Sequence, residues 1–322
     1  MIHAAALGEL LVDLTSVGTD ADGYPTLTAH PGGAPANFLA ALARFGAKTA
    51  FLGKVGEDAF GQMLTATLEK ARIDVSGLCT TPDAFTTLAF VTLDEAGERQ
   101  FSFARKPGAD TCISYDDLDL HLIDEARVFH FGSLSLTHEP ARTATRRAVD
   151  YARHAGCLIS YDPNLRRPLW RDLRTAREEI LWGLSQADVV KISDEEVDFL
   201  FGLDPQSGAE HILDAFGVKL VFVTCGGDGC VFRNPSASGM VPGLRGIQVV
   251  DTTGAGNIFG GSAVWKLLQL DIPPEALTEE QLREICSFAC VSAGLSTTRH
   301  GGLSSIPELQ DVLRVLDSGY PQ

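Results

Sequence analysis

The sequence predicts an α/β fold in which a mostly parallel sheet carries helices on both faces. Short apolar runs typical of buried strands recur at residues 4–7, 49–52, 128–131, 157–161, 189–192 and 220–223. Amphipathic segments typical of helices lie between several of them, at residues 36–45, 61–71, 141–154 and 174–185. Strands that alternate with helices in this way form parallel sheets, because each helical crossover returns the chain in the same direction.

Composition excludes several classes of protein. Hydrophobic residues make up 45% of the 322 residues, so the chain can bury a core without disulfides and is expected to form a single domain over residues 1–322. Its seven cysteines form no CxxC pair, which predicts a reduced, cytoplasmic protein. The net charge of −16 argues against a nucleic-acid partner. We expect neither a signal peptide nor a membrane partner, because the first residues are not basic and no run of 18 apolar residues occurs.

Small and polar residues follow the strand-like runs directly. Gly8 and Glu9 come after the first run, Asp162 after the run at 157–161, and Thr224 after the last. The carboxyl ends of parallel strands meet at one edge of a sheet, and ligands of open α/β sheets bind at that edge. The sequence therefore predicts a ligand cleft there.

Two segments interrupt the alternation of strands and helices. One covers about residues 11–30, with a strand expected at 26–29. The other covers about residues 85–106, where two β-rich arms flank a polar turn at 94–99, as in a hairpin. Neither segment contains a helical pattern, so we expect a separate small sheet that forms a lid over the cleft. The alternative is a peripheral hairpin that does not move.

The most informative segment is residues 251–257 (DTTGAGN), which follows a strand-like run at 246–250 and opens an apolar helix. Gly254, Ala255 and Gly256 allow a tight turn whose N–H groups point to one place, and the helix N-terminus adds partial positive charge. Such an anion hole suits a phosphate group. A dinucleotide-binding fingerprint is incomplete here and no Walker motif occurs, which argues against a dehydrogenase.

A second glycine-rich segment, residues 31–37 (PGGAPAN), leads into a helix. Gly32 and Gly33 permit a ligand to approach the backbone closely. Asn37 offers a donor and an acceptor to sugar hydroxyls. A plain turn at the start of a helix is the alternative interpretation.

These two segments resemble the two signatures of the ribokinase-like (PfkB-type) carbohydrate kinases, and the similarity covers nearly the whole chain. Residues 53–58, 60–61, 191–196, 223–229 and 298–301 also match. The resemblance implies a ribokinase-like three-layer sandwich with a mostly parallel central sheet and a small β-sheet lid. It further implies ATP and Mg²⁺ as cofactors, K⁺ as an additional cation, and a homodimer formed through the lid.

Within the family, residues 161–170 (YDPNLRRPLW), 101–110 and 130–135 resemble fructokinases. The implied reaction is phosphorylation of D-fructose to fructose 6-phosphate. Related 2-keto-3-deoxygluconate kinases share the DPNxR pattern and an arginine like Arg105, and a guanidinium can hold the carboxylate of their substrates bidentately. The Pro-Leu-Trp extension after Arg167 favours fructose, with the keto-acid sugar as the alternative.

The resemblance also assigns roles to single residues. It implies a sugar site at Asp13, Gly32, Gly33, Asn37, Arg105, Asp162, Asn164 and Arg166. In this site Arg105 would close from the lid and Arg166 from the core. It implies a nucleotide site at Lys191, Thr224, Gly226, Gly229 and Cys290. Glu196 would contact Mg²⁺ through water, although residues 193–196 also fit a capping box, and Asp251 would belong to a monovalent-cation site.

One position departs from the family. Asn257 stands where the family carries its catalytic aspartate, the general base. An amide has nearly the same shape but accepts no proton at neutral pH, and general bases contribute about 10²–10⁴-fold. We therefore expect impaired turnover, with a non-catalytic sugar- or nucleotide-binding protein as an alternative function. An engineered substitution accounts best for Asn257 because the rest of the site is intact; a natural change and a sequence error account for it less well.

Overall fold

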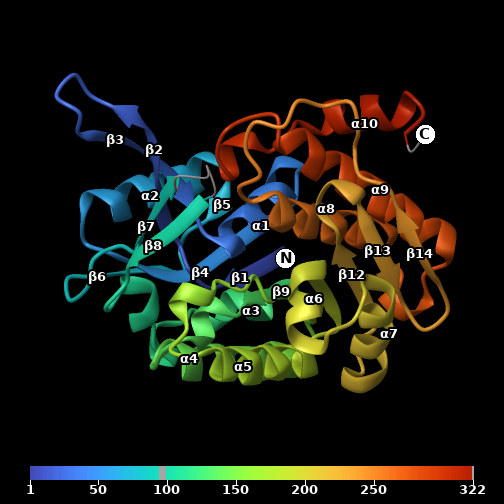
Figure 1. Cartoon of the computed structure of the whole chain (residues 1–322). Coiled ribbons are helices and arrows are strands. Elements are labelled where there is room, and N and C mark those ends of the chain that lie inside the picture. Colours follow the sequence, from blue (N-terminus) through green and yellow to red (C-terminus); the bar gives the residue numbers. More distant parts are fainter. Residues whose placement is uncertain (94–98, 321–322) are drawn as a thin grey trace.

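The computed structural model describes residues 1–93 and 99–320. Within them a ten-stranded sheet forms the centre, in the order β14-β13-β12-β11-β10-β9-β1-β4-β5, with β6 paired to β4 (Figure 1). Its strands are β1 (Ile2–Leu7), β4 (Thr49–Gly56), β5 (Ile73–Asp74), β6 (Leu78–Thr81), β9 (Ala126–Gly132), β10 (Leu158–Asp162), β11 (Val189–Ser193), β12 (Leu220–Thr224), β13 (Cys230–Arg233) and β14 (Ser238–Val241). Only the pairs β12–β13 and β13–β14 are antiparallel among the described pairs of this sheet. The predicted mostly parallel sheet is confirmed, and each of the six apolar runs contributes a strand.

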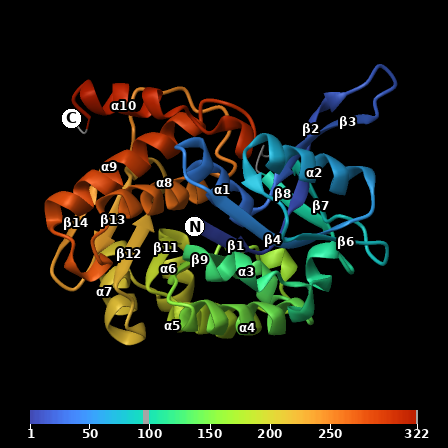
Figure 2. The same cartoon turned by 180° about the vertical axis from the view of Figure 1, so that it is seen from behind.

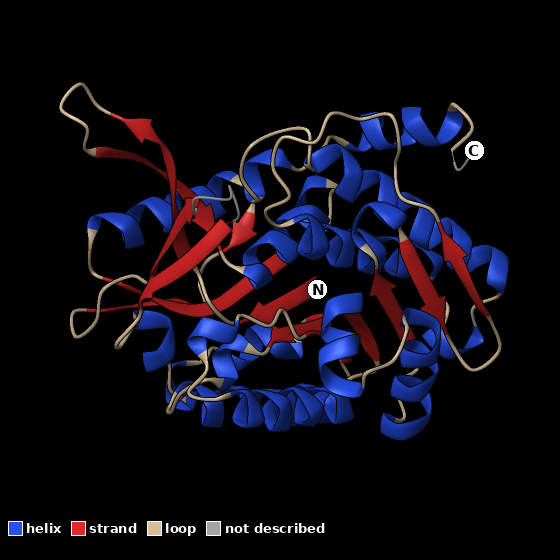
Figure 3. Ribbon diagram, in the orientation of Figure 1, coloured by secondary structure: helices blue, strands red, loops and turns tan. Residues whose placement is uncertain are grey.

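Helices cover both faces of this sheet. They are α1 (Ala34–Arg44), α2 (Ala59–Lys70), α3 (Leu120–Asp124), α4 (Ala141–His154), α5 (Leu173–Gln186), α6 (Asp194–Phe201), α7 (Pro205–Phe216), α8 (Ala255–Leu270), α9 (Glu279–Ser296) and α10 (Leu309–Asp317). Helices α1, α2, α8, α9 and α10 lie on one side and α3 to α7 on the other (Figures 2 and 3). Among these described helices, none has both the length and the apolar character needed to cross a membrane.

The strands feed two cores because successive side chains of a strand point to opposite faces. In β1, Ala5 and Leu7 pack into the core beneath α4 and α5, whereas Ala4 and Ala6 pack beneath α1 and α8. A strand segment buried on both faces must be apolar, which is why residues 4–7 of β1 form an uninterrupted apolar run. The three-layer sandwich is confirmed.

The two interrupting segments form a separate four-stranded sheet in the order β3-β2-β7-β8. Its strands are β2 (Leu11–Thr19), β3 (Pro25–Gly32), β7 (Leu88–Leu93) and β8 (Arg99–Ala104). Two antiparallel hairpins meet through the parallel pair β2–β7, and the tip of β2–β3 projects from the body (Figure 1). The predicted small sheet is confirmed. Most of the predicted turn, residues 94–98, lies outside the described residues.

The strand-like run predicted at 246–250 is wrong. This stretch has no regular secondary structure, and Val249 and Val250 are 58% and 41% exposed. The backbone N–H of Val250 and that of Asp251 both donate to the carbonyl of Thr297, at the end of α9, rather than to a strand. Because the valines are not buried, nothing stabilises an extended strand here.

Candidate active site

A cleft of about 970 Å³ lies at the carboxyl edge of the central sheet, as predicted. One wall comes from the small sheet, with Asp13, His30 and Phe103. The opposite side comes from the loops and helices that follow the central strands. Of the predicted site residues, the cleft brings together Asp13, Gly33, Asn37, Asn164, Arg166, Glu196, Asp251, Gly254 and Asn257. The small sheet therefore stands where a lid would stand.

Three helices begin at this cleft. The cleft is lined by Gly33 and Ala34 at the start of α1, by Ser193 at the start of α6, and by Gly254 at the start of α8. The first N–H groups of a helix have no partner within it and carry partial positive charge. Gly254 has a φ of 77°, in the left-handed region that favours glycine. Glu9 accepts from the N–H of Ala34 in α1 and the Ser193–Glu196 capping box closes α6, whereas α8 has no side-chain cap, so the start of α8 suits a ligand that carries phosphate groups.

Glu9 is a site residue to which the sequence assigned no role. It follows β1, is 2% exposed and lines the cleft, and its Oε1 accepts a hydrogen bond from the N–H of Ala34 at 2.7 Å. Gly33, with a φ of 123°, lies so close that a Cβ there would be 2.4 Å from the carbonyl oxygen of Glu9. Glu9 thus fixes the start of α1. The signal available in the sequence was a carboxylate directly after a buried strand at the ligand edge.

Two carboxyl groups of the cleft have raised pKa values. Burial raises the pKa of Glu9 to about 7, against the opposing effect of the Ala34 hydrogen bond. Burial also raises the pKa of Asp13 to about 6; Arg166 opposes that shift and Asp251 adds to it. Both groups hold a proton more readily in the folded chain than carboxyl groups in water do.

The raised pKa of Glu9 predicts a specific dependence of stability on pH. The folded chain binds this proton more tightly than the unfolded chain, so the stabilisation is complete below pH 4.5 and is lost as the pH rises to about 7. The loss is on the order of 3 kcal/mol. We expect the Tm of the wild type to fall between about pH 5 and pH 8 more steeply than that of Glu9→Gln. Glu308→Gln, at an exposed site, should keep the wild-type slope; parallel curves for Glu9→Gln and wild type would refute the assignment.

Asn257 lies in the first turn of α8 and belongs to a buried polar chain. Its Nδ2 donates to Oδ2 of Asp162 at 3.0 Å, and Nζ of Lys191 lies 3.3 Å from the same oxygen. Asp162 is 3% exposed and Lys191 stands close to Gly256, where a Cβ would be 2.9 Å from Nζ. Asp162 and Lys191 therefore lie beneath the cleft rather than on its surface.

Asn37 stands beside the start of α8. It is 4% exposed, and its Oδ1 is buried without a hydrogen-bond partner in the described part of the chain. A Cβ at Gly254 would be 3.0 Å from Nδ2 of Asn37, and one at Gly302 would be 2.4 Å from Oδ1. The two glycines give the amide its space, next to the turn that begins α8.

The carboxylates of both predicted metal-site residues, Glu196 and Asp251, accept hydrogen bonds from backbone N–H groups. Glu196 forms the predicted capping box with Ser193, and its Oε1 also accepts from the N–H of Leu165 at 2.6 Å. Asp251 accepts from the N–H groups of Thr253 and Gly301, each at 2.9 Å. In residues 1–93 and 99–320, no cluster of three or more His, Cys, Asp or Glu side chains could hold a metal directly. A carboxylate has about four lone-pair positions, so Glu196 keeps acceptors for the water shell of a cation.

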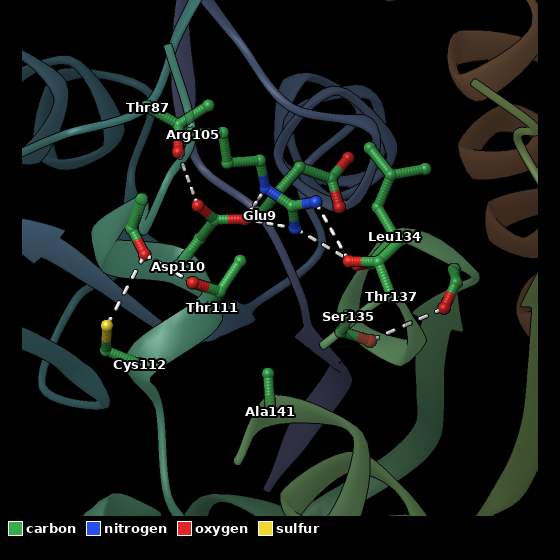
Figure 4. Close-up of polar contacts among 12 residues, drawn as sticks. Glu9, Thr87, Arg105, Asp110, Thr111, Cys112, Leu134, Ser135, Thr137 and Ala141 are labelled. Atoms are coloured by element: carbon green, nitrogen blue, oxygen red, sulfur yellow. Dashed lines mark hydrogen bonds and ion pairs between the residues drawn. The ribbon is translucent and has the colours of Figure 1, made fainter. Parts of the chain in front are cut away.

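Arg105, predicted to reach the sugar, does not line the cleft. It is 4% exposed, and its Nη2 and Nε lie 2.6 and 2.9 Å from Oδ2 of Asp110 (Figure 4). The same guanidinium donates to Oγ1 of Thr137 at 2.9 Å and to the carbonyl of Leu134 at 3.0 Å. Thr87 completes the network by donating to the other oxygen of Asp110. The ion pair lies within the segment that follows β8, and the hydrogen bonds to Leu134 and Thr137 tie that segment to the one after β9.

The predicted nucleotide residues lie beside the cleft and not in it. Thr224 ends β12 and pairs in register with Ser193, which lines the cleft. Gly226 and Gly229 form the turn that follows β12. Cys290, by contrast, is 6% exposed on α9 and packs among apolar residues between α8, α9 and β13, where burial strongly raises the pKa of its thiol. Thr224 and the glycines share the sheet edge with the cleft, whereas Cys290 is part of the core.

A three-layer α/β sandwich with a small sheet beside a cleft of converging helix starts is the architecture of ribokinase-like sugar kinases. The chain belongs to the pfkB family of carbohydrate kinases, which it matches over residues 1–309. It is 41% identical to fructokinase-1 of Zea mays over 315 residues, 97% of each chain. It is therefore a sugar kinase, a transferase that acts on a carbohydrate.

Solved structures agree with this assignment. An ATP-bound fructokinase from Xylella fastidiosa is 31% identical, with a TM-score of 0.89 and 98% of each chain covered. A fructokinase double mutant from Vibrio cholerae O395, in a form that binds fructose, ADP and potassium ion, is 30% identical, with a TM-score of 0.85 and coverage of 97% of this chain and 98% of that one. The ribokinase-like fold extends over nearly the whole chain.

Proposed function

We propose that this sugar kinase is a fructokinase, which converts D-fructose and ATP into fructose 6-phosphate, ADP and a proton. The similarity to curated fructokinases at about 40% identity supports this proposal. Among the physical observations, the charge of the cleft carries it, because that charge separates a neutral sugar from the carboxylate-bearing alternative.

The cleft contains more carboxylates than cationic groups. Glu9, Asp13, Glu195, Glu196 and Asp251 line it, whereas its arginines are Arg166 and Arg167. Arg105, the guanidinium that would grip a substrate carboxylate in the keto-acid alternative, already donates two hydrogen bonds to Oδ2 of Asp110. A substrate carboxylate would meet net repulsion here. A neutral sugar would instead find acceptors for its hydroxyl protons, so fructose fits better than 2-keto-3-deoxygluconate.

The proposed roles follow the geometry. Asp13, Gly33, Asn37, Asn164 and Arg166, which line the cleft, hold the hydroxyl groups of the sugar, together with the backbone of Gly32, which lies against Asp13. The first turn of α8, at Gly254, Ala255 and Gly256, receives the transferring phosphoryl group, and the turn after Thr224 lies where ATP would extend along the sheet edge. Asp251 is the proposed neighbour of a K⁺ ion. Mg²⁺, held through water near Glu196, would neutralise phosphate charge.

The small sheet is proposed to exclude water, so that the sugar and not water receives the phosphoryl group. Because β3 is at an edge of this sheet and Val17 and Tyr24 are 60% and 69% exposed, the lid is also the proposed contact of a homodimer. Asn257 cannot take the hydroxyl proton, so turnover by this chain is expected to be slow.

The test is a coupled assay of ADP release with MgATP and either D-fructose or 2-keto-3-deoxygluconate. We expect a higher kcat/KM for fructose in both the wild type and Asn257→Asp. A higher kcat/KM for the keto acid would overturn the proposal. If neither substrate is turned over by either form while calorimetry shows fructose binding, the alternative suggested by Asn257, a non-catalytic sugar-binding protein, replaces it.

A further inference from the structure

Asp162, Lys191 and Asn257 form a polar chain whose direction is fixed by chemistry. A lysine ammonium only donates hydrogen bonds and an ionised carboxylate only accepts them. Nζ of Lys191 lies 3.4 and 3.3 Å from the two oxygens of Asp162, and Nδ2 of Asn257 lies 3.0 Å from Oδ2. Asp162 thus receives a donor from each side. Its side chain is 4% exposed and that of Lys191 11%, so water screens this chain little.

The orientation of the Asn257 amide follows from this chain. If the amide were flipped, its Oδ1 would face Oδ2 of Asp162, and two acceptors without a proton between them repel. The amide is planar, so with Nδ2 bound to Asp162, Oδ1 points away from Asp162. Asn257 lines the cleft whereas Asp162 does not.

We propose that Asp162 is a positioning residue that holds the amide of Asn257 with its carbonyl oxygen, and not its NH₂ group, toward the sugar. This inference rests on the proposed function for the identity of the ligand. A hydroxyl group of the sugar then donates its hydrogen to Oδ1, which leaves a lone pair of the hydroxyl oxygen free to face the phosphorus. An NH₂ group in that place would instead occupy a lone pair of the attacking oxygen. Asp162 preserves in an Asn257 enzyme the acceptor that a carboxylate would supply.

A carboxylate at position 257 would not need this control, because its two oxygens are equivalent. The proposal therefore makes a prediction that depends on the residue at 257. In the wild type, Asp162→Asn allows the Asn257 amide to adopt both orientations, and we expect kcat with fructose to fall about tenfold, the equivalent of one charged hydrogen bond. In the Asn257→Asp background the same change removes a carboxylate that faces the new one, and we expect kcat to stay the same or rise.

A purely structural role for Asp162 would lower kcat equally in both backgrounds, and that result would overturn the proposal. Asp188→Asn is the matched control. Asp188 also pairs with a lysine, Lys219, at 2.9 Å, and accepts from the N–H of Ile159 at the opposite end of β10. Asp188→Asn should lower the stability of the protein, and its effect on kcat should be the same whether residue 257 is Asn or Asp.

A spectroscopic measurement tests the orientation without any turnover, so the proposal can be judged even if the chain is not a fructokinase. The sequence contains four asparagines, Asn37, Asn164, Asn234 and Asn257. The ¹⁵N-asparagine-labelled wild type therefore gives four side-chain NH₂ pairs, and Asn257→Asp identifies one of them; each Asp→Asn variant adds a fifth pair, recognised by its absence from the wild type. We expect slow exchange with water for the Asn257 pair, lost in Asp162→Asn and retained in Asp188→Asn. An Asn257 pair that exchanges equally in all three proteins would refute the contact.

Discussion

Asn257→Asp should raise kcat for fructose by about 10²–10⁴-fold, because it restores a side chain that can take the hydroxyl proton. The site has room for the new side chain. Asn257 is buried at the start of α8, beside Gly256 and beneath the cleft opening, and an aspartate is nearly isosteric with it. The measurement is steady-state ADP release with fructose and MgATP. KM for both substrates should change less than kcat, because most contacts to the ground state remain.

Asn257→Ala is the matched control for this prediction. Asn257→Ala removes the whole side-chain amide, including its acceptor oxygen, so its kcat should fall below that of the wild type. If Asn257→Asp were no faster than Asn257→Ala, position 257 would not carry the base, and the impairment would lie elsewhere. The pH profile adds a second check. The new carboxylate would stand about where Nδ2 now lies, 3.0 Å from Oδ2 of Asp162, and repulsion between the two carboxylates raises the apparent pKa of the pair.

Much of the fold was predictable because its signals are local. Residues 220–223 are apolar throughout, and a strand buried on both faces requires that pattern in so short a run. The capping box at Ser193 and Glu196 was equally local, since its partners are three residues apart. The stretch at 246–250 contains two valines, a pattern that predicts a strand, but no strand lies beside it. The sequence of one segment does not reveal whether a partner strand is available for hydrogen bonding.

The site was predictable where a motif combines a glycine with a helix start, as at Gly254, and less so where it depends on contacts between distant residues. Asp162 and Asn257 are 95 positions apart, so the hydrogen bond that orients the amide was invisible in the sequence. Arg105 illustrates the same limit. An arginine side chain suits a contact to a ligand, yet only the folded chain shows that the guanidinium of Arg105 forms an ion pair with Asp110. Glu9 was visible only as a carboxylate at a strand end.

The Arg105–Asp110 pair carries the last prediction, which concerns stability. Each side chain of the pair is 2% exposed, and removal of one member of a buried pair leaves an uncompensated charge that costs about 3–5 kcal/mol. Asp110→Ala should therefore lower the Tm by about 10 °C, at the 2–4 °C per kcal/mol typical of large domains. Glu308→Ala, which breaks the exposed Arg44–Glu308 pair, should cost less than about 1 kcal/mol. Equal effects of the two variants in thermal unfolding would contradict the assignment.

The double variant Arg105→Met/Asp110→Leu separates stability from sugar binding. With both charges replaced by apolar groups, no charge is left unpaired, and stability should return to within about 2 kcal/mol of the wild type; the remaining loss reflects Thr87, whose hydroxyl loses its acceptor. The fructose KM of the double variant is measured in the Asn257→Asp background, where turnover is expected to be faster. We expect this KM to stay within about threefold, because Arg105 makes no hydrogen bond to the sugar in the proposed site, and the loss of such a bond would raise KM by more than this. A stable double variant whose fructose KM rises more than tenfold would show instead that Arg105 leaves Asp110 and reaches the sugar when the lid closes.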